Sequence, residues 1–259
     1  MMRRAILGQV SGAGLGWVTL LLTTVGLLSD CEPQASATTK TVAPAKPRFL
    51  SYAVEPRRLA LYWRDEKGKP LRSLGGLRNW LTGRGQRLVF AANGGMYRQG
   101  NVPVGLFVEN GRLRIPLDTG SGPGNFYLRP NGVFSLTTDG RAVIQPTAAF
   151  RFGPQTRYAT QSGPMLVVEG RIHPAFQAGS RNLNVRNGVG VLPDGQVLLV
   201  MSKEPVNLYD FARYFQRRGC RNALYLDGFV SRTYWPAGGS PQTDGDFGVM
   251  VGVTEPVRK

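Results

Sequence analysis

The sequence contains little cysteine, histidine or acid, and each shortage excludes a class of site. Of its 259 residues, two are cysteines and one is a histidine, so the chain has no Cys/His set with zinc-ligand spacing. Removal of an N-terminal leader would leave Cys220 without a partner for an internal disulfide. A nucleophilic Cys220 would need a histidine base, and His173 is the only histidine, so we expect a buried, inert thiol.

Long apolar runs are also missing, and this indicates a leader rather than a membrane span. The run from Leu15 to Leu28 is shorter than the ~20 residues that cross a bilayer as a helix. It follows a basic start and precedes small residues at Ala35–Ala37, a pattern that predicts a signal peptide over residues 1–37. Residues 38–47 are polar and proline-bearing and predict a linker. We therefore expect a periplasmic or extracellular protein; lipidation at Cys31 or an uncleaved membrane anchor stays open.

Acidic residues are half as frequent as basic ones. The chain has 16 Asp and Glu against 32 Lys and Arg, a formal net charge of +16 and a pI near 10.6. Such a charge favours contact with anionic polymers or surfaces, which for an exported protein include phosphate-bearing glycans, polysaccharides and anionic lipids. The basic residues are scattered, with no basic helix or aromatic-basic repeat, so we expect no nucleic-acid binding. Membrane contact is expected only through an uncleaved or lipidated N-terminus.

Glycine and proline are abundant, at 34 and 18 residues, and favour a strand-rich fold with many turns. Short apolar runs are separated by turn signals, and two segments have helical spacing, one within residues 73–81 and one between an Asn207 cap and Gly219. We therefore predict a single α+β domain of hairpins with a few helices over residues 48–255. The predicted hairpin turns are Asn110-Gly111, Asn131-Gly132, Asp139-Gly140, Glu169-Gly170 and Pro193-Asp194-Gly195.

Four segments place polar side chains and glycines at the ends of apolar strands, where a core does not require them. Each segment alone is better explained as a turn, because Asp, Asn and Gly suit turn conformations. Together, however, the four could line one cleft. They are Asn93-Gly94-Gly95-Met96-Tyr97, Thr160-Gln161-Ser162-Gly163-Pro164, Arg186-Asn187-Gly188, and Asp227-Gly228 with Ser231 and Arg232.

These segments resemble motifs of the phosphodiester glycosidase family. That family includes the catalytic domain of N-acetylglucosamine-1-phosphodiester α-N-acetylglucosaminidase and many exported bacterial proteins, and the chain most resembles an exported bacterial branch of mainly uncharacterised or exopolysaccharide-related proteins. The resemblance covers about residues 49–253. The similar motifs are Asn93-Gly94-Gly95, Gly163-Pro164 before "MLVVEG", Arg186 with Gly190, and "LYLDG" with Ser231. Two departures are Phe229-Val230 in place of glycines, and Ser202-Lys203-Glu204 where the family often has Asp-Gly-Arg.

The resemblance implies a hydrolase that cleaves the bond between a sugar's anomeric carbon and a phosphodiester oxygen. Such a site needs a cation for the phosphate and a carboxylate for the oxocarbenium-like centre. Arg186 is the candidate for the phosphate, and Asp227 is the candidate base, nucleophile or electrostatic stabiliser. Glu204 is a second candidate carboxylate, and His173 could contact phosphate or shuttle a proton. The other substrate-binding candidates are Asn93, Gly94, Tyr97, Gln161, Ser162, Gly163, Asn187, Gly228 and Ser231.

The sequence alone leaves a metal site and two other functions open. The dispersed carboxylates assign no metal, although a hard cation such as Ca²⁺ could bind at Asp227. The main alternative to an enzyme is a non-catalytic envelope protein that binds anionic glycans through its basic surface. A different hydrolase on the same scaffold is a third reading, because fold alone does not fix the reaction.

Overall fold

The computed structural model describes residues 47–228 and 230–257. The predicted signal peptide, Cys31 within it and the predicted linker up to residue 46 lie outside the described residues, as does Phe229. Neither helix in the described part of the chain is long and apolar enough to cross a membrane.

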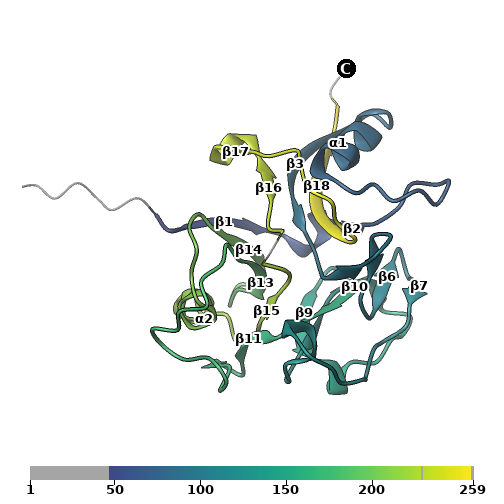
Figure 1. Cartoon of the computed structure of the whole chain (residues 1–259). Coiled ribbons are helices and arrows are strands. Elements are labelled where there is room, and N and C mark those ends of the chain that lie inside the picture. The colour runs from purple at the N-terminus through teal and green to yellow at the C-terminus, as the bar shows by residue number, and fades with distance from the viewer. Residues whose placement is uncertain (1–46, 229, 258–259) are drawn as a thin grey trace, which may run out of the picture. The chain divides into compact units, whose positions relative to one another are not determined.

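Three antiparallel sheets carry most of the described strands (Figure 1). The first sheet contains, in spatial order, β1 (Phe49–Val54), β14 (Val197–Ser202), β13 (Asn187–Val191), β15 (Ala223–Tyr225), β11 (Met165–Val168) and β12 (Arg171–Ile172). The second contains β7 (Arg112–Ile115), β6 (Phe107–Glu109), β10 (Thr156–Ser162), β8 (Gly132–Thr137) and β9 (Ala142–Pro146). The third contains β17 (Ser240–Pro241), β16 (Thr233–Trp235), β3 (Gln86–Asn93), β18 (Met250–Pro256) and β2 (Leu59–Tyr62).

Smaller elements connect these sheets. A two-stranded hairpin is formed by β4 (Tyr97–Arg98) and β5 (Val102–Pro103). The two α-helices are α1 (Leu74–Thr82) and α2 (Leu208–Arg217). Single 3₁₀ turns occupy Pro56–Arg58, Asn125–Tyr127, Thr147–Ala149 and Pro236–Gly238. The fold is therefore α+β and strand-rich, as the composition predicted.

Four of the five predicted hairpin turns join paired strands, and one does not. The turns at residues 110, 139, 169 and 194 connect β6–β7, β8–β9, β11–β12 and β13–β14. The segment before Asn131-Gly132 is not a strand, so that predicted hairpin is wrong. The Asn131 side-chain amide donates to the Phe126 carbonyl at 2.9 Å, and Pro130 has no N–H for a ladder. Asn131 therefore closes a loop and leads into β8.

One shared core joins the three sheets. Buried side chains from each of them pack together, including Leu199 from β14, Phe134 from β8 and Phe90 from β3. Burial of this apolar surface is the main favourable term in folding, and it fixes the strand ends relative to one another.

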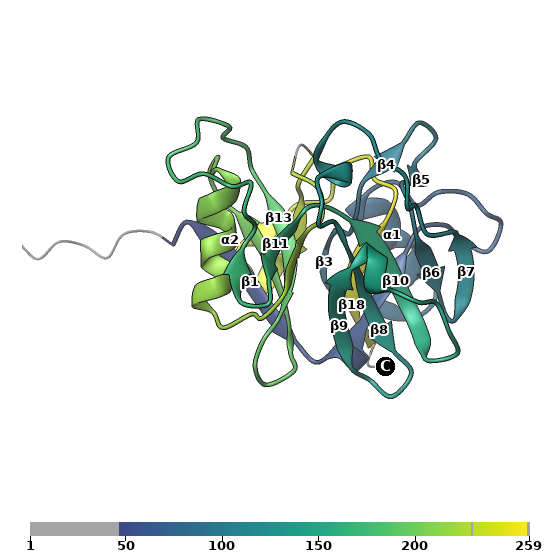
Figure 2. The ribbon, with the colours of Figure 1, turned by 90° about the horizontal axis from the view of Figure 1, so that it is seen from below.

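The two helices have the predicted positions. In α1, Leu74, Leu77 and Leu81 pack on the third sheet. In α2, Phe211 and Phe215 pack on the sheet that contains β11 and β13 (Figure 2).

The α2 helix lies very close to β13, and this explains a glycine in that strand. A Cβ at Gly190 would lie 2.7 Å from both the Phe215 ring and the Cys220 sulfur. Asn207 caps the helix by accepting from the Asp210 N–H at 2.8 Å, and Gly219 follows its end with a φ of +80°. Burial raises the pKa of the Cys220 thiol to about 11, in keeping with the expected inert cysteine.

Candidate functional site around Asp227

Asp227 lies two residues after the end of β15, half-buried, at the border of an open cleft of about 530 Å³. Tyr97 and Arg98 of β4, Asn101 of the β4–β5 turn, and Asp246 also line this cleft. The cleft therefore combines carboxylates with a tyrosine and cationic side chains. We call it the Asp227 cleft.

Two buried asparagines hold the backbone at Asp227. The Asn187 side chain accepts from the Asp227 N–H at 2.9 Å and donates to the Asn93 carbonyl at 2.7 Å. The Asn93 side chain donates to the Asp227 carbonyl at 3.2 Å and accepts from the Arg232 N–H at 3.1 Å. These bonds join the ends of β3, β13 and β15 at one point. A buried polar group needs such partners, which explains why amides stand at these strand ends.

Two buried serines complete this arrangement. Ser162, the last residue of β10, donates to the Leu226 carbonyl at 2.7 Å. Ser231 donates to the Asp227 carbonyl at 2.8 Å. The four side chains of Asn93, Ser162, Asn187 and Ser231 thus bind main-chain atoms on both sides of the Asp227 side chain, and we call them the backbone clamp. Their direct contact with a substrate stays a prediction.

The predicted glycines have close protein neighbours. A Cβ at Gly228 would overlap the Tyr225 hydroxyl oxygen, and one at Gly163 would lie 2.7 Å from the Phe126 carbonyl oxygen. At Gly94, a Cβ would come within 3.1 Å of the β18 backbone at Val251. Glycine at these positions lets neighbouring segments approach the backbone closely.

Tyr97 and Asp227 lie near each other in the cleft, as the sequence predicted. Tyr97 is half-buried, and its pKa is raised, first by burial and then by the charges of Asp227 and Asp246. Tyr97 therefore stays protonated at neutral pH and offers an O–H and an aromatic face. Of the two residues that replace family glycines, Val230 is described, and it lines the cleft.

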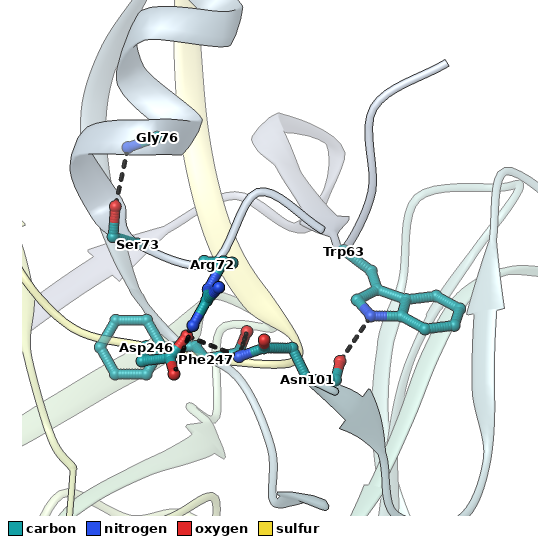
Figure 3. Close-up of polar contacts among 7 residues, drawn as sticks. All are labelled: Trp63, Arg72, Ser73, Gly76, Asn101, Asp246 and Phe247. Carbon is teal, nitrogen blue, oxygen red and sulfur yellow. Dashed lines mark hydrogen bonds and ion pairs between the residues drawn. The ribbon is translucent and has the colours of Figure 1, made fainter. Parts of the chain in front are cut away.

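Sequence reasoning missed the polar cluster that forms another part of the cleft wall (Figure 3). Arg72 forms two bonds to the Asp246 carboxylate, at 2.8 and 3.0 Å. Asn101 donates to the same carboxylate at 2.7 Å and to the Phe247 carbonyl at 3.0 Å. Trp63 donates to the Asn101 carbonyl at 2.6 Å. The bonds from Arg72, and then from Asn101, lower the pKa of Asp246, so this carboxylate is ionised at neutral pH.

Two other predicted residues, Gln161 and Glu204, have partners away from Asp227. Gln161 is buried, and its side chain bonds the Leu106 and Asp118 backbones at 2.7–3.0 Å. Glu204 has a side chain that is 52% exposed and pairs with Arg48. Neither Gln161 nor Glu204 lines the Asp227 cleft. The neighbouring residues Gln161 and Ser162 diverge because successive side chains of a strand point to opposite faces.

His173 is buried, and both of its ring nitrogens are bonded. Nδ1 accepts from the Ala175 N–H at 3.1 Å, so Nε2 carries the proton and donates to the Arg129 carbonyl at 3.1 Å. Burial lowers the pKa of the ring, and the ring stacks on Phe176. This geometry fixes a neutral imidazole that supports a loop.

Arg186 also lies outside the Asp227 cleft. The residue lines a different pocket, whose lining shares no residue with that cleft. Among the described residues, no group of three or more His, Cys, Asp or Glu side chains is placed to hold a metal ion. The predicted Ca²⁺ at Asp227 therefore stays a prediction.

Comparison with known proteins identifies the family. Residues 86–254 match the family model for phosphodiester glycosidases. The chain is 33% identical over 245 residues to the uncharacterised protein YigE of Escherichia coli, covering 93% of this chain and 96% of that protein.

Solved structures show the same fold at low identity. The catalytic domain of zebrafish N-acetylglucosamine-1-phosphodiester α-N-acetylglucosaminidase, auto-inhibited by its pro-peptide, matches with a TM-score of 0.57 at 14% identity, over 82% of this chain and 85% of that one. A protein from Burkholderia pseudomallei matches with a TM-score of 0.51 at 14% identity, over 79% of this chain and 73% of that one. Because the family model and the Escherichia coli protein both match the sequence over most of its length, the chain belongs to the phosphodiester glycosidase family.

Proposed function

We propose that the protein is an exported hydrolase of a sugar-1-phosphodiester bond in an envelope polymer or exopolysaccharide, with Asp227 as its reacting carboxylate. The observation that carries the proposal is the backbone clamp. Four buried side chains from separate segments fix the backbone at Asp227, and Asp227 borders an open cleft. Fixed placement of a reacting group is a large contribution that a protein scaffold makes to catalysis. Membership of the phosphodiester glycosidase family supports the reaction class.

In the proposed reaction, the bond between the anomeric carbon and the phosphate oxygen breaks, and that oxygen leaves with the electron pair as a phosphomonoester. A water oxygen forms the new bond to the anomeric carbon. Asp227 takes the water proton as a base, or first attacks the anomeric carbon as a nucleophile, or stabilises the oxocarbenium-like charge. Phosphate is a good leaving group, so the reaction does not require a strong general acid.

Other groups of the Asp227 cleft fit the substrate's two parts. Arg98 lines the cleft, is exposed, and has no ion pair among the described residues, so its guanidinium is available to a phosphate oxygen. Arg72 is already paired with Asp246. The aromatic face of Tyr97 suits stacking on a sugar ring. We therefore assign phosphate contact to Arg98 and sugar contact to Tyr97 within this proposal.

The test is turnover of a panel of sugar-1-phosphodiesters by protein that lacks residues 1–37. Asp227→Asn keeps the backbone groups that the clamp binds and removes the charge, so we expect turnover to fall by roughly 10²–10⁴-fold. The matched control is Asp194→Asn in the exposed β13–β14 turn, which should leave turnover unchanged. Wild-type turnover by Asp227→Asn would remove Asp227 from the mechanism.

The same panel separates the enzyme from the alternative, a glycan-binding envelope protein. The net charge of +16 would support binding of anionic glycans without chemistry. In that case no member is hydrolysed, and salt-sensitive glycan binding is equal for wild type and Asp227→Asn. Hydrolysis of any member that Asp227→Asn abolishes excludes this alternative.

A further inference from the structure

Arg186 carries a buried charge that the Asp227 cleft does not use. It directly precedes β13 and is only 2% exposed, which places it among the largest fully buried side chains described. Guanidinium groups stay protonated in proteins. No ion pair to Arg186 occurs among the described residues, although an ionised group without a counter-charge is costly to bury.

Neutral groups hold the guanidinium in place. Nε donates to the Val206 carbonyl at 2.7 Å, and Nη2 donates to the Asn182 carbonyl and side-chain oxygen at 2.9 and 3.2 Å. Nη1 donates to the Tyr225 hydroxyl at 3.2 Å. A guanidinium has five N–H groups, so these four bonds leave one N–H of Nη1 for another acceptor. The side chain is thus rigid but still carries a net positive charge and one donor.

Arg186 lines a pocket of about 200 Å³, which we call the Arg186 pocket. Its walls include Ala175 and Ser180 of the loop after β12, and Leu208 and Tyr209 at the start of α2. The start of an α-helix carries partial positive charge and N–H groups without an acceptor inside the helix.

Asp210 lies in the first turn of α2, where its charge counteracts that of the helix start, but the first N–H groups of the helix are not bonded by the cap. The Asn207 cap bonds the Asp210 N–H, not the amides of Leu208 and Tyr209. The Asp210 carboxylate accepts from the Asn207 side chain at 3.2 Å and does not line the pocket. Arg186 and the helix start therefore favour the same sign of ligand.

We propose that the Arg186 pocket binds a phosphate-type oxyanion, separately from the Asp227 cleft. An oxyanion would accept from the remaining Nη1 N–H, neutralise the buried guanidinium and meet the first-turn amides of α2. The inference does not depend on the proposed hydrolysis, because it concerns binding in a pocket with its own lining. Its ligand is either free inorganic phosphate or a phosphate group carried on a larger molecule.

The experiment measures binding of inorganic phosphate by calorimetry at constant ionic strength, with chloride as the competing anion. Wild type should bind phosphate, and Arg186→Met should bind it at least tenfold more weakly. Arg181→Met is the matched control, because Arg181 is an exposed arginine in the same loop and does not line the pocket. It should bind as wild type does. Asp227→Asn should also bind as wild type, which keeps this result independent of turnover.

A second variant tests the pocket without removing the buried charge. Ala175 is exposed at the pocket wall and bonds His173 only through its backbone N–H, so Ala175→Phe should fill the pocket and leave the fold intact. We expect at least a tenfold loss of phosphate affinity, and this variant decides the matter if Arg186→Met does not fold. Phosphate binding no tighter than chloride, or wild-type affinity in Ala175→Phe, would overturn the proposal.

Glycerol phosphate then distinguishes the two sources. If it displaces inorganic phosphate with similar affinity, the pocket recognises a phosphate group on a larger molecule. If inorganic phosphate binds and glycerol phosphate does not displace it, the ligand is the free anion. Both results leave the oxyanion site in place, and they assign its occupant.

Discussion

Asp227 and Arg186 lie beyond the ends of two neighbouring strands of one sheet, yet the protein fixes them in opposite ways. β13 and β15 pair so that Gly188 faces Tyr225. At Asp227, side chains hold the backbone, and the carboxylate stands at an open cleft. At Arg186, carbonyl and hydroxyl oxygens hold the side chain, and one N–H remains for a ligand. The first arrangement suits a group that reacts, and the second suits a group that binds.

The largest expected effect comes from breaking the backbone clamp. Asn187→Ala leaves the buried Asp227 N–H and the Asn93 carbonyl without their partners. Each such group costs about 1–3 kcal/mol, so we expect the free energy of unfolding to fall by about 2–5 kcal/mol in urea titrations.

Asn79→Ala is the control, because Asn79 is exposed on α1. It should change the free energy of unfolding by less than about 0.5 kcal/mol. Equal stability of Asn187→Ala and wild type would show that the clamp does not hold the Asp227 backbone.

An intermediate effect is expected at Gly228, which lies between the two sites. A Cβ there would overlap the Tyr225 hydroxyl that Arg186 bonds. Overpacking of this kind costs about 1–3 kcal/mol, so Gly228→Ala should lower the unfolding midpoint and weaken both turnover and phosphate binding.

Tyr225→Phe removes the overlapping oxygen and provides a rescue. The double variant should regain part of the stability that Gly228→Ala loses, and a double-mutant cycle measures this coupling. Additive losses would mean that the Tyr225 hydroxyl is not the atom that excludes a side chain at residue 228.

The smallest expected effect is a pH dependence of the protein's stability that arises at His173, whose ring bonds a residue of the Arg186 pocket wall. His173 binds the Ala175 N–H through Nδ1, and burial lowers its pKa below the usual 6.5. The unfolded chain therefore binds a proton more readily, and stability should be constant above about pH 7 and fall as the pH drops through 6.5.

The free energy of unfolding should therefore be lower at pH 5.5 than at pH 7.5 because of this one group. This loss should be absent in His173→Gln, and comparison of urea midpoints at the two pH values measures the difference. An equal loss in both proteins would assign the acid sensitivity to other groups.

Local patterns in the sequence predicted the fold well. The two helices and four of the hairpin turns depend on residues that are neighbours along the chain. In α2, for example, the start is marked by Asn207 and the end by Gly219. The prediction at Asn131-Gly132 was wrong because its side chain bonds a loop carbonyl rather than closing a strand pair. A turn signal alone does not show which of these two roles an asparagine takes.

The site was harder to predict, because its contacts join distant segments. The sequence predicted that polar strand ends would meet, and Asn93, Asn187 and Asp227 do meet. It did not indicate that the asparagines would bind backbone, or that Arg186 would have a separate pocket. The bonds of Arg72 and Asn101 to Asp246 span 174 and 145 residues, so no local motif marks them.

The backbone clamp has a consequence for engineering. Its bonds at residue 227 go to the N–H and the carbonyl, which every amino acid except proline provides. The fold therefore does not need an aspartate side chain to keep the clamp bonds at this position. A different functional group, such as a thiol or a longer carboxylate, can be placed at residue 227 beside the same cleft with these main-chain bonds retained.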